Sequence, residues 1–128
     1  MQYLLLIYIQ PDAYEGLSPK EQNVLVDEYW AFDHDLLQSG EFLGSNALEG
    51  PDATTSVRVS DGEAVVSDGP FVETKEVLGG YYLVDCPDLD RALELAALIP
   101  SNKRGRPVVE VRPVIAFEPP AWMRASPS

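Results

Sequence analysis

The residues best placed to do chemistry begin at Asp68, which opens the sequence Asp-Gly-Pro-Phe. Gly69 and Pro70 restrict the loop, so we expect the Asp68 carboxylate to be fixed at the end of a strand. Next to an apolar wall such as Phe71, that carboxylate could serve as a general acid or base. It could equally accept hydrogen bonds from the following backbone amides, as aspartates in turns do. The sequence leaves both interpretations open.

Three polar residues follow in the same stretch, Glu73, Thr74 and Lys75. The hydroxyl of Thr74 and the ammonium of Lys75 are groups that hold an anionic ligand. A solvated turn with a local ion pair of little energetic value explains the same residues. These three residues are therefore candidates for ligand binding, close to the candidate acid or base.

Aromatic and basic side chains on the expected strands could complete a cleft. Tyr8, Tyr81 and Tyr82 lie in apolar runs, and Arg112 alternates with apolar neighbours on the last strand. Arg112 is suited to carboxylate or phosphate recognition, and it is equally suited to pairing with Glu110 on the same face. We take Tyr8, Tyr81 and Arg112 as further candidate ligand-binding residues.

The other common signs of chemistry are missing from the sequence. His34, the single histidine, lies between two acids on an expected helix, which is typical of a surface residue. No group of His, Cys and Asp has the spacing of metal ligands, and no phosphate-binding or dinucleotide-binding glycine motif occurs. We therefore expect neither a metal nor a cofactor. The lone Cys86 is expected to be a small core residue in a reducing, cytoplasmic compartment.

The net charge is the strongest signal in the composition. The chain has 9 Lys and Arg residues against 21 Asp and Glu residues, which gives a formal charge of −12. Nucleic acids and anionic membranes are bound through basic groups, so this charge disfavours both partners. The apolar start of the chain is too short to span a bilayer. Small molecules, basic protein surfaces and a second copy of the chain remain as partners.

The elements expected to position these residues form an α+β domain over residues 1–117, followed by a proline-rich tail over 118–128. Ser18 caps a helix that Gly40 ends, with Leu25, Tyr29, Phe32 and Leu36 on its inner face. Asp88 caps a second helix, with Leu89, Leu93, Ala96 and Ile99 inward and Pro100 as its end. Strands are expected over 3–9, 41–47, 57–59, 64–66, 81–86 and 108–115.

This order is βαββαβ with an inserted β-hairpin, the ferredoxin-like plan. Two helices cover only one face of such a sheet, yet Leu4, Leu6 and Tyr8 place apolar side chains on the other face. Burying about six such side chains is worth roughly 9–18 kcal/mol, as much as the whole stability of a domain. We therefore expect a homodimer that pairs the two sheets as a dimeric α/β barrel.

The run from Asp68 to Tyr82, DGPFVETKEVLGGYY, resembles the signature of DGPF-domain proteins in the YCII-related superfamily. The opening YLLLIY and closing VEVRPV are similar to that family too. The resemblance implies a ferredoxin-like dimer, a link to sigma-factor pathways and, for the wider superfamily, a catalytic His–Asp pair. His34 does not match that histidine by motif. Two functions follow: a homodimeric ligand-binding or regulatory domain, or an enzyme using Asp68 on an anionic small molecule.

Overall fold

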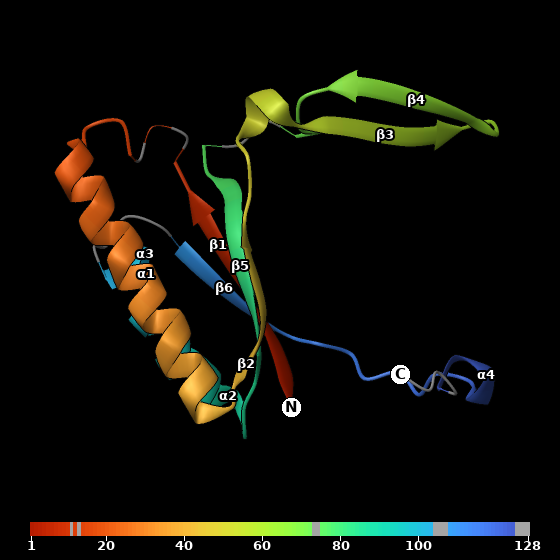
Figure 1. The fold of residues 1–128 in the computed structure, drawn as a ribbon. Coiled ribbons are helices and arrows are strands. Elements are labelled where there is room, and N and C mark those ends of the chain that lie inside the picture. Colours follow the sequence, from red (N-terminus) through yellow and green to blue (C-terminus); the bar gives the residue numbers. More distant parts are fainter. Residues whose placement is uncertain (11, 13, 73–74, 104–107, 125–128) are drawn as a thin grey trace.

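The computed structural model describes residues 1–128 except 11, 13, 73–74, 104–107 and 125–128. Its centre is an antiparallel sheet with helices on one face, while a β-hairpin and the C-terminal segment extend away on the other side (Figure 1). The elements are β1 Gln2–Ile9, α1 Pro19–Ser39, β2 Phe42–Ala47, the 3-10 helix Pro51–Ala53, β3 Thr55–Ser60, β4 Glu63–Asp68, β5 Val77–Asp85, α2 Leu89–Leu98, α3 Pro100–Lys103, β6 Val108–Pro113 and α4 Ala121–Arg124.

The strand order confirms the predicted ferredoxin-like plan. The main sheet runs β2-β5-β1-β6, and β3 pairs with β4 in a separate sheet of two strands. Removing that hairpin leaves βαββαβ with both central strands antiparallel to their neighbours. Asp61 and Gly62 turn the hairpin with positive φ values of 51° and 80°, as an Asp-Gly turn requires.

The first helix forms where its sequence signals place it. The Ser18 side chain accepts a hydrogen bond from the Glu21 amide, the Glu21 carboxylate accepts one from the Ser18 amide, and Gly40 ends the helix with φ 78°. The predicted inner face is also confirmed, because Leu25, Phe32 and Leu36 are buried. This face packs on the side of the sheet that carries the odd-numbered residues of β1, which are Tyr3, Leu5 and Ile7.

The predicted inner face of the second helix is partly wrong. Leu89 and Leu93 are 47% and 49% exposed, while Ala92 and Leu95 are buried together with the expected Ala96 and Ile99. Residues 92, 95, 96 and 99 form a second stripe at helical spacing, and its alanines allow the helix to approach the sheet closely. The predicted end of the helix is confirmed, because α2 stops at Leu98 before Pro100, which starts the separate short helix α3.

A pair of glycines lets β2 approach β5. A Cβ on Gly80 would lie 3.0 Å from the Asn46 carbonyl oxygen, and one on Gly79 would lie 2.8 Å from Ile9 Cδ1. Gly79 also sits at the register shift between β1 and β5. The two glycines therefore let β5 pack closely against β2 and β1, and they leave the local surface of β5 without side chains.

We expect Gly80→Ala to lower the free energy of unfolding by about 1–2 kcal/mol, because backbone must move to admit the methyl group. Gly44→Ala in the neighbouring strand is the matched control, since a Cβ there meets nothing within 4 Å. Urea unfolding of both variants measures the difference. Equal stabilities for the two would show that β2 does not approach β5 as described.

Candidate functional site

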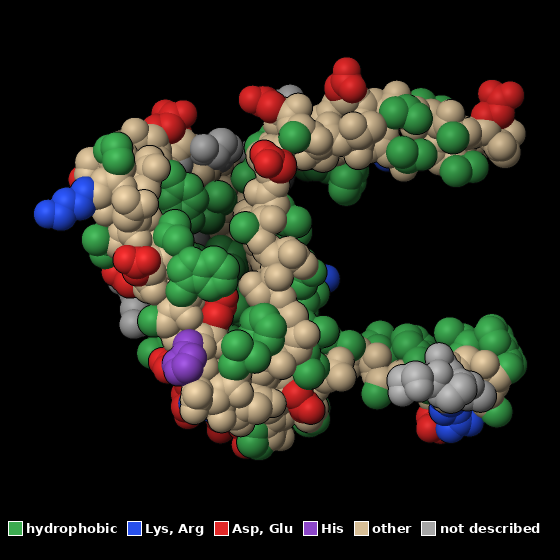
Figure 2. Space-filling view, viewed as in Figure 1, with side chains coloured by type: hydrophobic (Ala, Val, Ile, Leu, Met, Phe, Trp, Pro, Cys, Tyr) green, Lys and Arg blue, Asp and Glu red, His purple; other side chains and the backbone are tan. Residues whose placement is uncertain are grey.

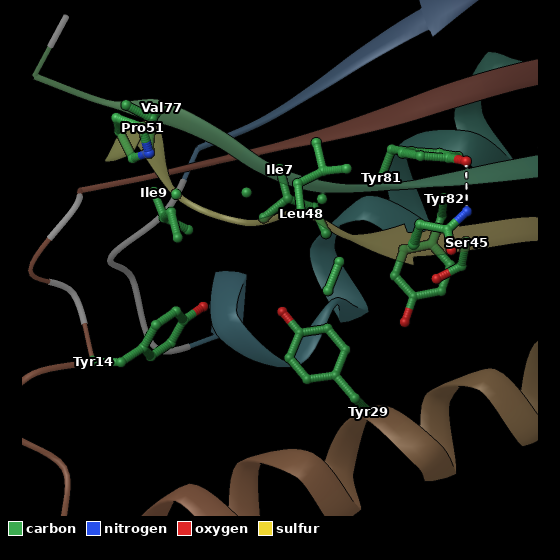
Figure 3. Close-up of a pocket in the computed structure, with 15 residues that line it drawn as sticks. Ile7, Ile9, Tyr14, Tyr29, Ser45, Leu48, Pro51, Val77, Tyr81 and Tyr82 are labelled. Atoms are coloured by element: carbon green, nitrogen blue, oxygen red, sulfur yellow. Dashed lines mark hydrogen bonds between the residues drawn. The ribbon is translucent and has the colours of Figure 1, made fainter. Parts of the chain in front are cut away.

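The candidate site is a pocket between α1 and the adjoining half of the sheet. Its volume is about 340 Å³, within the range of cavities that bind small molecules. Figure 3 shows side chains from the sheet on one side and Tyr14 and Tyr29 on the other. The lining residues are Ile7, Ile9, Tyr14, Tyr29, Ser45, Asn46, Ala47, Leu48, Gly50, Pro51, Val77, Gly79, Gly80, Tyr81 and Tyr82.

Two of the lining tyrosines are anchored by hydrogen bonds behind the pocket. The Tyr82 hydroxyl donates to Asp33 Oδ1 at 2.5 Å, and the Tyr29 hydroxyl shares a short hydrogen bond with the Ser101 hydroxyl. Burial raises the pKa of both phenols, and the Asp33 carboxylate raises that of Tyr82 further. Both tyrosines are therefore protonated at physiological pH and offer neutral hydroxyl groups.

A third tyrosine contributes a polar atom on the same side of the pocket. Tyr14 lies in the segment that leads to α1, and its hydroxyl points with that of Tyr29 into the space before the sheet (Figure 3). Asn46 on β2 also borders the pocket, but its amide donates to the Tyr81 hydroxyl at 2.8 Å on the face of the sheet opposite the helices. The helix side of the pocket thus carries hydroxyl groups, and the remaining wall is mainly aliphatic.

The electrostatic character of the pocket is simple. Each of its fifteen lining residues is uncharged. A charged ligand would lose hydration there without meeting an opposite charge among the described lining residues, which is costly. Tyrosine rings and aliphatic walls favour a flat apolar body, and hydroxyl groups can bond to one or two oxygens on it. The site can bind and orient such a molecule.

The residues predicted to carry acid or base chemistry lie outside this pocket. Asp68 ends β4, opposite Thr55, and its side chain is exposed. Lys75 is also exposed and lies in the connection to β5. Neither residue lines the pocket. Glu73 and Thr74 lie outside the described residues.

The structure brings the three other predicted residues to one face of the sheet. Tyr81 and Glu110 both pair with Leu6, and Tyr8 and Arg112 lie on the same face of the strands, opposite the helices. Arg112 Nε donates to Glu110 Oε1 at 2.5 Å, which is the pairing the sequence offered as an alternative to ligand recognition. Only Tyr81 of the predicted set contributes to the pocket.

Sequence reasoning missed Tyr14, Tyr29 and Asp33 as parts of the site. Tyr29 was assigned to the core stripe of α1, and it does pack there. The available signal was its hydroxyl, because a tyrosine in an otherwise apolar stripe needs a polar partner inside the molecule. Asp33 lies one residue after Phe32, so the same helix turn that enters the core also carries a carboxylate to Tyr82.

The remaining candidates have ordinary surroundings. His34 is exposed on α1, and Cys86 is buried with its thiol bonded to the Asp88 carbonyl. Among the described residues, no three His, Cys, Asp or Glu side chains lie close enough to hold a metal ion. In the same part of the chain, no helix has the length and apolar character needed to cross a membrane.

The fold of this chain, a ferredoxin-like sheet with helices on one face, has a counterpart among solved structures. The 5-chloro-2-hydroxyhydroquinone dehydrochlorinase TftG from Burkholderia phenoliruptrix AC1100, in complex with 2,5-dihydroxybenzoquinone, superposes with a TM-score of 0.55. The match covers 91% of this chain and 96% of TftG at 11% sequence identity, so it shows a common fold.

The sequence itself matches the YCII-related domain over residues 1–118, and the chain belongs to that family. It is also similar to an uncharacterized protein of Rhizobium meliloti (strain 1021), with 33% identity over 119 residues. That similarity covers 93% of this chain and 96% of the relative. The resemblance stated from the DGPF run is thereby confirmed at the level of the family.

Proposed function

We propose that the chain is a ligand-binding domain whose helix-side pocket takes a small, uncharged, oxygen-bearing ring compound. The observation that carries this proposal is the pocket of about 340 Å³, lined by uncharged residues and carrying the hydroxyl groups of Tyr14, Tyr29 and Tyr82. Because Tyr29 and Tyr82 have raised pKa values, neither phenol brings a negative charge to the pocket. The Tyr82 proton is donated to Asp33, so toward a ligand the Tyr82 oxygen acts as an acceptor.

The charge of the ligand follows from the pocket and from the whole chain. An anion would enter the field of a protein with formal charge −12 and find no cationic group in the lining. A cation would be attracted over distance but would lose its hydration in the pocket. An uncharged ring loses little on entry and gains burial against Ile7, Ile9 and the tyrosine rings.

The likeness to TftG supports the fold of this pocket and does not by itself define its ligand. Its complex contains 2,5-dihydroxybenzoquinone, a flat ring that carries oxygen atoms. The ligand class inferred from the residues of this chain is of the same general kind.

Three naphthalene probes test the ligand class: 2-naphthol, its carboxylate analogue 2-naphthoate, and the cation 1-naphthylmethylammonium. We expect 2-naphthol to bind at least about tenfold more tightly than either charged probe at pH 7, because each charge costs more than 1.4 kcal/mol without a partner. Isothermal titration calorimetry measures the three affinities. Tighter binding of a charged probe would contradict the ligand class, and no binding of any probe would contradict the pocket function.

We also infer that the domain works as a homodimer through the uncovered face of its sheet. Leu4, Leu6, Tyr8 and Leu83 lie on this face and are only half-buried in a single chain. Among the described residues this face carries two charged pairs, Glu110 with Arg112 and the Met1 amino group with Asp85, and each is internally neutral. A second copy would bury this apolar surface without bringing unpaired charges together.

Two functions predicted from the sequence remain as separate proposals. In the regulatory alternative, the acidic surface meets a basic region of a sigma-factor-pathway protein, in agreement with the resemblance. In the enzymatic alternative, Asp68 acts as acid or base on an anionic substrate near Lys75. That substrate would have to bind at the hairpin, because neither residue lines the pocket.

A further inference from the structure

Two segments leave the body of the domain and carry unusually apolar surfaces. We name the β3–β4 hairpin, residues 55–68, the hairpin arm, and residues 114–124 the tail arm. Figure 2 shows both projecting from the same side of the molecule, with hydrophobic side chains along them and a wide gap between them. Neither arm packs into the core cluster, which is formed by the sheet and helices.

The hairpin arm lacks the support that a two-stranded sheet needs. Its strands pair only with each other among the described strands. Its apolar residues are 50–69% exposed, although isolated two-stranded hairpins are marginally stable in water. The residues concerned are Val57, Val59, Val65 and Val66. A surface of this kind is stabilised by another chain segment that covers it.

The tail arm is still more exposed. Ile115, Phe117 and Trp122 are 72%, 82% and 79% exposed, and Met123 is 58% exposed. The arm has internal order, since residues 121–124 form α4 and Arg124 pairs with Glu118 at 3.6 Å. Monomeric proteins rarely leave so many large apolar side chains in one short segment exposed to water.

The positions of the arms define what fits between them. The amide of Val114 donates to the Gln2 carbonyl, so the tail arm leaves beside the first residue of β1. The hairpin arm leaves near the other end of β1, where the Leu48 amide donates to Gly79 and Val77 pairs with Ile9. The arms are therefore separated by the length of a strand of 8 residues, about 26 Å. The sheet of a second copy has strands of the same length, so it fits between the two arms.

The area needed for a stable dimer points to the same occupant. A sheet face of four strands, each about seven residues long, covers roughly 450 Å². A standard stable interface buries about 800 Å² of accessible surface on each partner, which is more than this flat area. The two aromatic side chains of the tail arm alone would add about 300 Å². The arms therefore supply the surface that face-to-face pairing of the sheets lacks.

We propose that the two arms clasp a second copy of the chain, with the tail arm packed on the partner protomer. This inference rests on the proposed homodimer and adds an exchanged segment to it. Phe117 and Trp122 are its anchors, because both are about four-fifths exposed in a single chain and large aromatic side chains dominate the energetics of interfaces. Each protomer then gives one tail arm and receives one.

Tryptophan fluorescence follows the tail arm directly. Trp30→Phe leaves Trp122 as the only tryptophan of the chain, since the sequence contains two. We expect Trp122 emission to move to shorter wavelength in the dimer, and to return to that of a water-exposed indole when Leu6→Lys on the sheet face prevents association. Far-ultraviolet circular dichroism establishes that the Leu6→Lys chain is folded. Short-wavelength emission in that folded monomer would place the tail on its own domain and overturn the proposal.

A second measurement separates this inference from the homodimer itself. Phe117→Ser with Trp122→Ser is expected to raise the dimer dissociation constant more than about tenfold in analytical ultracentrifugation. The control is Trp30→Ser, a 67% exposed tryptophan on α1, which should leave the constant unchanged. An unaltered dissociation constant in the double variant would overturn the proposed exchange of the tail arm but would not contradict the homodimer. A wild-type monomer at all micromolar concentrations would overturn both.

Discussion

Ala47→Trp is expected to remove most of the affinity for 2-naphthol. Ala47 lines the pocket and lies opposite Gly80, which has no side chain, so an indole has room to enter the cavity. Losing the burial of about half a bicyclic ring costs roughly 2 kcal/mol, which corresponds to an affinity about thirtyfold weaker. Calorimetric titration of 2-naphthol into the variant measures the loss.

The control for this prediction is Ala53→Trp. Ala53 is an exposed alanine of the 3-10 helix between β2 and β3, and it does not line the pocket. The same substitution there adds the same indole to the surface and should leave 2-naphthol affinity unchanged. Equal losses in the two variants would mean that tryptophan acts through general surface effects, and no loss in either would place the binding site elsewhere.

Arg91→Ala is expected to lower the free energy of unfolding by about 2–3 kcal/mol. Arg91 on α2 binds both carboxylate oxygens of Glu41 at the start of β2, at 2.9 and 2.8 Å, and Glu41 is only 8% exposed. Removing the guanidinium leaves a buried carboxylate whose one remaining side-chain partner among the described residues is the Ser39 hydroxyl. Glu94→Gln, which removes the exposed partner of Arg91, should cost under about 1 kcal/mol.

The same pair should make stability depend on pH. The hydrogen bonds from Arg91 hold the pKa of Glu41 below its ordinary value, although burial opposes them. A carboxyl group with a lowered folded-state pKa stabilises the protein above its unfolded pKa, about 4.3, and this contribution is lost as the pH falls through the folded-state pKa. Glu41→Gln should therefore be less stable than wild type at pH 7, and this difference should shrink below pH 4.3.

Urea unfolding of wild type and Glu41→Gln between pH 3 and pH 7 checks this dependence. A difference that stays constant over the whole range would show that Glu41 keeps the same protonation state in both forms of the protein. A difference that grows towards acid would contradict the direction of the shift. Either outcome would show that the ion pair between Arg91 and Glu41 does not stabilise the protein in the pH-dependent way described.

The fold was predictable because its signals are local. The capping box at Ser18, the glycine at position 40 and the Asp-Gly turn each determine one boundary from a few neighbouring residues. Alternation along β1 gave the two faces of the sheet for the same reason. The inner face of α2 was not predictable in this way, because two apolar stripes compete there and the sheet selects the one with alanines.

The site was less predictable because its residues are distant in sequence. Tyr29 meets Ser101, and Tyr82 meets Asp33, only after α1 has packed on the sheet. Asp68 was a more conspicuous candidate for a functional residue than the pocket tyrosines, because its neighbours Gly69 and Pro70 constrain it locally. A constrained turn is a conspicuous pattern, whereas a pocket depends on which side chains the tertiary fold leaves unfilled.

Nuclear magnetic resonance of the ¹⁵N-labelled protein during titration with 2-naphthol tests the central claim most directly. The pocket predicts chemical-shift changes at the amides of Ser45, Gly79, Gly80 and Tyr82, with the amides of the hairpin arm unchanged. Changes centred on Asp68 and Lys75, or on the Tyr8 and Arg112 face of the sheet, would contradict it and place ligand binding at the residues that the sequence favoured.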